Sequence, residues 1–140
     1  MLFFGCRSRE DDYYYESEWS EASEFLDVHH AFSRAQARKV YVQDVVREKV
    51  RSGESGAKAR GERRTLVANT VRSSQEVEVA RHLLELRGAV CVAGGASMAT
   101  DVRKAIVEIL GKRIEGGEKQ AERYLNALKK AGLFAIEAWS

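Results

Sequence analysis

Short apolar runs alternate with amphipathic segments along this chain. Four apolar runs predict strands, at residues 2–6, 26–32, 89–93 and 133–139. The third run, AVCVA, is apolar at every position, as a strand covered on both faces requires. The pattern therefore indicates at least one strand in the interior of a sheet.

The segments between these strands carry helical spacing. Apolar residues that share one helical face predict helices at residues 13–25, 75–87, 96–110 and 118–131. Ser97 is placed to cap the start of the helix at 96–110. Gly132 follows the last helix directly, and glycine at that position is typical of a helix end.

The middle of the chain is less regular. The β-rich residues 40–42 lead into a further helix, which we expect to run to about residue 51. Residues 52–74 are rich in Gly, Ser, Lys and Arg and show no sustained period. This composition predicts a flexible insertion.

The order of these elements indicates the fold class. Strands separated by helices favour a parallel sheet, because parallel neighbours need a crossover connection. We therefore predict an α/β fold with a doubly wound parallel sheet, in one domain over residues 1–140. Ligands bind such sheets at the carboxyl ends of the strands.

Composition and charge exclude several function classes. Apolar residues make up 44% of the 140 residues, enough for a core, and the net charge of +2 requires any anion site to be local. Cys6 and Cys91 form no CxxC pair, which fits a reducing compartment and argues against a metal site. No apolar run is long enough to span a bilayer, and the N-terminal segment turns acidic too soon for a signal peptide.

Hydroxyl and cationic side chains gather where the second predicted strand ends. The stretch AFSRAQARKVYVQ places Ser33 and Arg34 directly after that strand and Lys39 a few residues later. A hydroxyl, a forked guanidinium and an ammonium group suit a phosphate. The segment GGAS, at the end of the third strand, leads into a helix N-terminus, which is also a natural anion site. The pattern favours a nucleotide, and ordinary solvated loop charges are the alternative.

Four segments, in this order, carry a family resemblance: LFFGCRSREDDYYYESEW, AFSRAQARKVYVQ, VAGGASMATDV and the terminal EAWS. The chain resembles the C-terminal NADPH-binding part of the NADPH-dependent diflavin oxidoreductases, whose reductase module is ferredoxin-reductase-like. The words ESEW and EAWS resemble those of the soluble cytosolic branch that serves iron–sulfur assembly. The resemblance implies a cytoplasmic enzyme that passes hydride from NADPH to FAD, and electrons through FMN to an iron–sulfur assembly protein.

The resemblance also implies roles for individual residues in cofactor binding. Ser33 and Arg34 match the family's SR pair, which holds the 2′-phosphate and selects NADPH over NADH. Lys39, Tyr41 and Gln43 match the KxYxQ word, which completes the adenosine-phosphate site.

Three further residues match positions near the site of hydride transfer. Asp101 matches the aspartate of the MxxDV word, close to the cofactor. Trp139 matches a C-terminal aromatic residue that covers the flavin ring of FAD and must move aside for nicotinamide. Glu137 matches an acidic position beside the reacting groups. From the residues alone, Trp139 is a strand residue packed at the edge of a core, and Glu137 a solvated carboxylate.

The chain departs from the family in what it lacks. The family places an FAD-binding barrel, a first strand and a Gly-rich pyrophosphate loop upstream, and none is present here. Since the family's first strand lies between the second and the fourth, we expect two inner sheet edges without a partner. The resemblance therefore implies a partial domain, from a longer protein or an incomplete gene product, that is inactive when isolated.

Two other functions stay open from the residues. The first is a noncatalytic nucleotide-binding or interaction module that keeps Ser33, Arg34 and Lys39. The second is nucleic-acid binding through basic residues around the insertion, but no aromatic residue is interleaved for base stacking, so we expect no nucleic-acid partner. These basic residues are Lys58, Arg60, Arg63, Arg64 and Arg72. Cys91 is expected to be a buried structural thiol.

Overall fold

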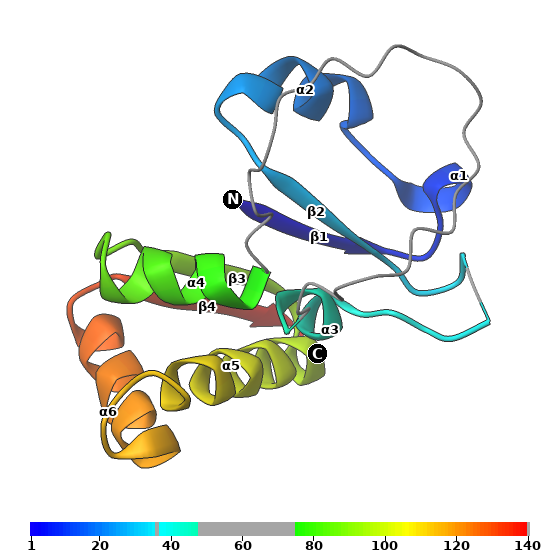
Figure 1. Ribbon diagram of the computed structural model, residues 1–140. Helices are drawn as coiled ribbons and strands as arrows, with labels where there is room; N and C mark the ends of the chain where they lie inside the picture. The colour runs from blue at the N-terminus through cyan, green and yellow to red at the C-terminus, as the bar shows by residue number, and fades with distance from the viewer. Residues whose placement is uncertain (36, 48–74, 140) are drawn as a thin grey trace, which may run out of the picture.

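The computed structural model describes residues 1–35, 37–47 and 75–139 (Figure 1). The insertion predicted at residues 52–74 lies outside the described residues. The elements are, in chain order, β1 Leu2–Cys6, α1 Arg9–Asp12, α2 Glu16–Glu21, the 3-10 helix η1 Ala22–Glu24, β2 Val28–Phe32, α3 Val42–Val46, α4 Gln75–Leu84, β3 Val90–Gly95, α5 Ala96–Gly111, α6 Gly117–Lys130 and β4 Phe134–Trp139.

The strands form two parallel pairs. Strand β1 pairs with β2 from Leu2 opposite Val28 to Cys6 opposite Phe32. Strand β3 pairs with β4 from Val90 opposite Phe134 onward. The predicted parallel direction is confirmed. The single doubly wound sheet is not seen: in the described part of the chain each pair is a separate two-stranded sheet.

Helices join the two sheets. Helix α3 packs on β1 and β2, α5 packs on β3 and β4, and α3 and α5 pack on each other. All four strands run in one general direction, since β1 and β4 point the same way in Figure 1 and each pair is parallel. The carboxyl ends of the strands therefore lie on one side of the molecule.

The hydrophobic core is concentrated around the second sheet. Its buried side chains come chiefly from α4, α5 and α6, with Val92 of β3 and Phe134 of β4. The first sheet contributes Phe3, which is only partly buried against this core. The two sheets are therefore unequal in burial, and the β3–β4 half holds most of the apolar contact.

An aromatic cluster covers the opposite face of the first sheet. Phe4 of β1 and His30 of β2 pack against Tyr13 and Trp19 from the segment around α1 and α2. The ring centroids of Phe4 and Trp19 are 4.6 Å apart, and the rings of His30 and Phe32 are stacked. This cluster anchors the segment between β1 and β2.

Several element boundaries differ from the predictions. The predicted helix at 13–25 is broken, because Tyr15 adopts a left-handed conformation with φ of 64° before α2 begins. Ser97 does not cap α5: the N-cap is Gly95, and no side chain caps the helix. Gly132 does end α6, with φ of 75° and a hydrogen bond from its N–H to the carbonyl of Lys129.

Candidate functional site

The carboxyl ends of β1 and β2 are held together by backbone hydrogen bonds beyond the last ladder pair. The N–H of Ser33 donates to the carbonyl of Cys6 at 2.9 Å, and the N–H of Arg34 donates to that of Arg7 at 2.7 Å. The Ser33 hydroxyl also lies 3.4 Å from the Cys6 carbonyl oxygen. The SR pair therefore sits at a fixed strand end, as the sequence predicts.

The cationic side chains after β2 are free to meet an anion. Arg34, Arg38 and Lys39 are exposed, and within the described residues none of them makes an ion pair. Exposed guanidinium and ammonium groups keep their full complement of donors. The geometry is compatible with phosphate binding at this strand end.

The other two residues predicted to bind the adenosine end, Tyr41 and Gln43, belong to the start of helix α3. Tyr41 is its N-cap, is 44% exposed, and donates its backbone N–H to the Asp44 carboxylate at 3.0 Å. Gln43 is half-buried, and its side-chain oxygen has no hydrogen-bond partner among the described residues. A buried acceptor without a donor is costly unless a ligand or water supplies one.

The ends of β3 and β4 carry the residues expected near hydride transfer. Trp139 lies opposite Gly95 in the ladder and is 63% exposed. Glu137 lies opposite Ala93 and is also exposed. Asp101 is half-buried on α5. Trp139 is therefore not packed into the protein core.

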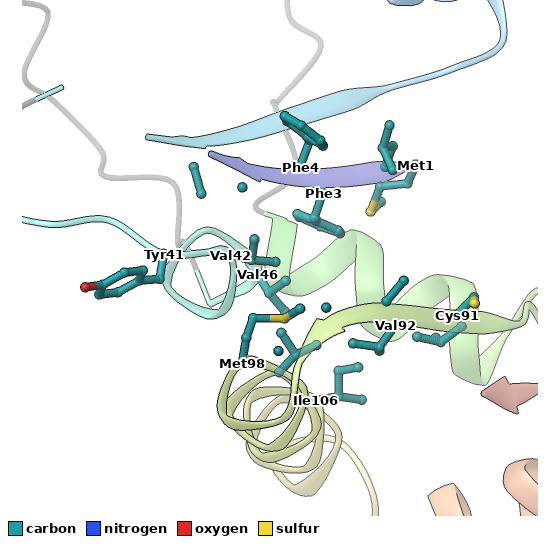
Figure 2. A pocket seen from close by; sticks show the side chains of 18 of the residues that line it. Met1, Phe3, Phe4, Tyr41, Val42, Val46, Cys91, Val92, Met98 and Ile106 are labelled. Atoms are coloured by element: carbon teal, nitrogen blue, oxygen red, sulfur yellow. The ribbon is translucent and has the colours of Figure 1, made fainter. Parts of the chain in front are cut away.

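One cavity connects the two strand ends. It has a volume of about 830 Å³ and lies between β1 and β3 (Figure 2). Its lining residues include Ser33, Tyr41 and Trp139. We call it the inter-sheet cavity. The other predicted residues do not line it: they are Arg34, Lys39, Gln43, Asp101 and Glu137. The structure thus brings a residue of the phosphate end and the C-terminal aromatic ring to one cavity.

Arg7 is a cation of this site that was not singled out as a ligand from the sequence. It lines the inter-sheet cavity at the end of β1, and its Nε lies 3.0 Å from an oxygen of Asp12. The Asp12 carboxylate also accepts from the backbone N–H groups of Arg7 and Ser8. Burial acts to raise the pKa of Asp12, but these hydrogen bonds outweigh it and lower the pKa. The sequence signal was available, because Arg7 follows the first predicted strand as Arg34 follows the second.

The cysteine expectation was wrong in one respect. Cys91 is exposed on β3, not buried, because its side chain lies on the face opposite to Val92. Among the described residues, no group of three or more His, Cys, Asp or Glu side chains could hold a metal ion.

Comparison with curated proteins identifies relatives along the whole chain. It is 35% identical to the NADPH-dependent diflavin oxidoreductase 1 of Arabidopsis thaliana, across 100% of this chain and 20% of the relative. It is 31% identical to the protein of the same name from Xenopus laevis, across 99% of the chain and 19% of the relative. The NADPH–cytochrome P450 reductase of Drosophila melanogaster is 30% identical across 100% of the chain and 17% of the relative.

The chain matches the C-terminal, NADPH-binding part of a diflavin reductase. No family model matches it. The relatives named NADPH-dependent diflavin oxidoreductase 1 are, by that name, oxidoreductases that depend on NADPH and use two flavins. The chain spans about a fifth of the length of the first two of these relatives. Within the described residues, no helix has the length and apolar content to cross a membrane.

Proposed function

We propose that this chain binds NADPH through its adenosine 2′-phosphate at the carboxyl ends of β1 and β2. The hydroxyl of Ser33 and the guanidinium of Arg34 hold the phosphate, and Lys39, Tyr41 and Gln43 complete the adenosine end. The observation that carries the proposal is that Ser33, Tyr41 and Trp139 line one cavity although they come from distant parts of the sequence.

The electrostatics of the strand end support a phosphate rather than a neutral ligand. Arg34 and Lys39 are exposed and not ion-paired within the described residues, so binding an anion breaks no existing salt bridge. Arg7 adds a third cation, although it already pairs with Asp12. A phosphate dianion gains charge-assisted hydrogen bonds from such a group of donors.

The other end of the cavity supports a role in hydride transfer. Trp139 stands exposed at the end of β4, where an aromatic ring can cover a flat flavin ring. Glu137 lies on the same strand, and Asp101 is on α5, where we place it beside the nicotinamide end. FAD, held largely by the rest of the reductase, would accept the hydride of NADPH and pass two electrons to FMN.

We infer further that the intact protein is a cytoplasmic reductase whose electron acceptor is an iron–sulfur assembly protein. Support comes from the ESEW and EAWS words and from the relatives named NADPH-dependent diflavin oxidoreductase 1. A noncatalytic nucleotide-binding or interaction fragment is the second candidate. The separation of the described strands into two sheets favours it, because the cavity between them has no central strand.

The nucleotide site is tested by titrating the 140-residue chain with NADP⁺ and NAD⁺ in a calorimeter. We expect NADP⁺ to bind more than tenfold tighter, a difference of about 1.4 kcal/mol or more. Arg34→Ala should abolish that preference. Arg38→Ala is the matched control, since it removes another exposed arginine four residues away, and it should leave the preference largely intact. Equal losses in both variants would instead indicate a diffuse effect of positive charge.

A further inference from the structure

A single carboxylate closes the turn that follows β1. Asp12, the last residue of α1, accepts with Oδ1 from the backbone N–H of Arg7 at 2.8 Å and from that of Ser8 at 3.2 Å. The Asp12 side chain is 19% exposed and lines the inter-sheet cavity. The backbone of the turn therefore fixes the position of this carboxylate at the carboxyl end of β1.

The second oxygen of Asp12 holds the Arg7 side chain at one point. Oδ2 lies 3.0 Å from Nε, the inner nitrogen of the guanidinium group. Nε carries one N–H, and the two Nη groups carry the other four. Within the described residues, neither Nη group of Arg7 donates to a protein acceptor. The outer edge of the guanidinium group is therefore available to a ligand.

The Arg7 side chain starts close to the proposed phosphate site. The backbone carbonyl of Arg7 accepts from the N–H of Arg34 at 2.7 Å, and the N–H of Ser33 donates to the carbonyl of Cys6. Arg7 thus leaves the end of β1 next to the point where Ser33 and Arg34 leave the end of β2. In the described part of the chain no carboxylate pairs with Arg34, so Arg7 is the arginine whose orientation the protein fixes.

A guanidinium group that is already held should bind phosphate with a smaller loss of entropy than a free one. A long exposed side chain samples many rotamers, and ordering it on binding opposes association. Asp12 restricts this motion in advance and leaves a pair of donor groups that matches the oxygens of a phosphate. The carboxylate also repels a phosphate, but Arg7 is 53% exposed, so water screens the repulsion. Orientation should therefore be the larger effect.

We propose that Asp12 is a positioning residue for nucleotide binding: it fixes Nε of Arg7 so that both Nη groups are free to donate to one phosphate of the ligand. The inference rests on the proposed NADPH site and adds to it a residue that does not touch the nucleotide. The phosphate belongs either to the 2′ position or to the pyrophosphate bridge, which offer the same acceptor oxygens. Comparing NADP⁺ with NAD⁺, which lacks only the 2′-phosphate, distinguishes these two sources.

Asp12→Asn tests this role in the full 140-residue chain. Asparagine has nearly the same shape, and its side-chain oxygen can still accept from the backbone N–H groups of Arg7 and Ser8, but its neutral amide no longer holds Nε. We expect the calorimetric affinity for NADP⁺ to fall by about threefold to tenfold, the factor that corresponds to ordering one long side chain on binding. A parallel loss with NAD⁺ would assign the contact to the pyrophosphate, and a loss with NADP⁺ alone to the 2′-phosphate. Unchanged or increased affinity for NADP⁺ would overturn the proposal.

The same substitution in an Arg7→Ala background separates positioning from support of the turn. Without the Arg7 side chain, Asp12→Asn should change the affinity for NADP⁺ by less than about twofold. An equal loss in both backgrounds would mean that Asp12 only maintains the fold of the turn. Arg7→Lys keeps the charge but not the paired Nη groups, so it should lose most of the affinity that Arg7→Ala loses. Wild-type affinity in Arg7→Lys would contradict the proposal.

NMR relaxation of the arginine Nε–H groups gives a readout that needs no nucleotide. In the free wild-type chain the Nε–H of Arg7 should be ordered, and in Asp12→Asn its order parameter should fall below about 0.6, the flexible range. The Nε–H of Arg34 is the control and should not change. NADP⁺ binding by a wild-type chain with a mobile Arg7 would refute the role of Asp12 alone, whereas an ordered Arg7 without NADP⁺ binding would refute the nucleotide site as well.

Discussion

At the scale of single residues, His30 makes the stability contributed by the aromatic cluster depend on pH. Its ring is stacked on Phe32 and hydrogen-bonds to the Tyr13 hydroxyl. Burial lowers its pKa from 6.5, and the charges of Arg9 and His29 lower it further. Because the folded state disfavours the protonated ring, the contribution of this residue to stability is complete above the unfolded pKa and declines as the pH falls through the lowered folded value.

His30→Phe should therefore weaken the loss of stability between neutral pH and about pH 5, near the unperturbed histidine range. Phenylalanine keeps an aromatic ring in the cluster but cannot take up a proton. Urea unfolding at several pH values measures the effect. An unchanged dependence of stability on pH in His30→Phe would exclude the role of His30.

The loss of stability on truncating a leucine side chain should depend on how deeply that side chain is buried. Leu125 of α6 is 1% exposed, so Leu125→Ala should lower the free energy of unfolding by about 2–5 kcal/mol through lost contacts and a residual cavity. Leu86, which is 54% exposed, is the matched control. Leu86→Ala should cost no more than about 0.5 kcal/mol in denaturant unfolding, as surface substitutions usually do. A similar cost in both variants would contradict the core assignment.

The residues of the candidate site were predictable to different degrees. Ser33 and Arg34 follow a strand end, and strand ends are readable from apolar runs. Arg7 follows a strand end in the same way but was not selected, because a single arginine after a strand is an ordinary solvated residue. The exposure of Trp139 depends on what packs against β4, which no local pattern records.

At the scale of elements, an ion pair joins α3 to α5. Arg47 at the end of α3 donates from Nε and Nη2 to both oxygens of Glu108, at 2.6 and 3.2 Å. The hydrogen bond from Arg47 lowers the pKa of Glu108. This pair therefore stabilises the fold above the unfolded glutamate pKa, and its contribution is lost as the pH falls through the lowered folded value.

A double-mutant cycle on Arg47→Met and Glu108→Gln should give a coupling of roughly 0.5–1 kcal/mol near neutral pH, because the pair is bidentate and half-buried. The coupling should fall at low pH and in high salt. Arg103 and Glu122, between α5 and α6, form a more exposed single contact of 3.3 Å. Their coupling should be smaller, and a reversed order would refute the special role of Arg47.

Element prediction succeeded where periodicity was long. The helix over 96–110 and the end of α6 at Gly132 were correct, since many residues share one pattern there. The helix over 13–25 was wrong in its continuity. The aromatic residues of this segment pack together in the cluster on β1 and β2. The left-handed conformation of Tyr15 interrupts the helix before α2.

At the scale of the whole molecule, the fold class was predictable and the sheet was not. The positions of the strands follow from local apolar runs in the sequence. Their parallel direction follows from the helices that connect them. Whether strands join one sheet depends on a partner for each edge, and the described residues provide none between β1 and β3. Helices α3 and α5 instead connect the β1–β2 sheet to the β3–β4 sheet. The position of the carboxyl ends of one strand pair relative to those of the other therefore depends on the packing of these helices.

The central claim is that the anion bound at the end of β2 is a ribose 2′-phosphate. The most direct measurement compares the affinities of the chain for adenosine 2′,5′-bisphosphate and adenosine 5′-monophosphate, which differ only in that group. The account predicts that the bisphosphate binds more than tenfold tighter, by about 1.4 kcal/mol or more, and that Arg34→Ala removes the difference. Equal affinities in the folded wild-type chain would contradict it.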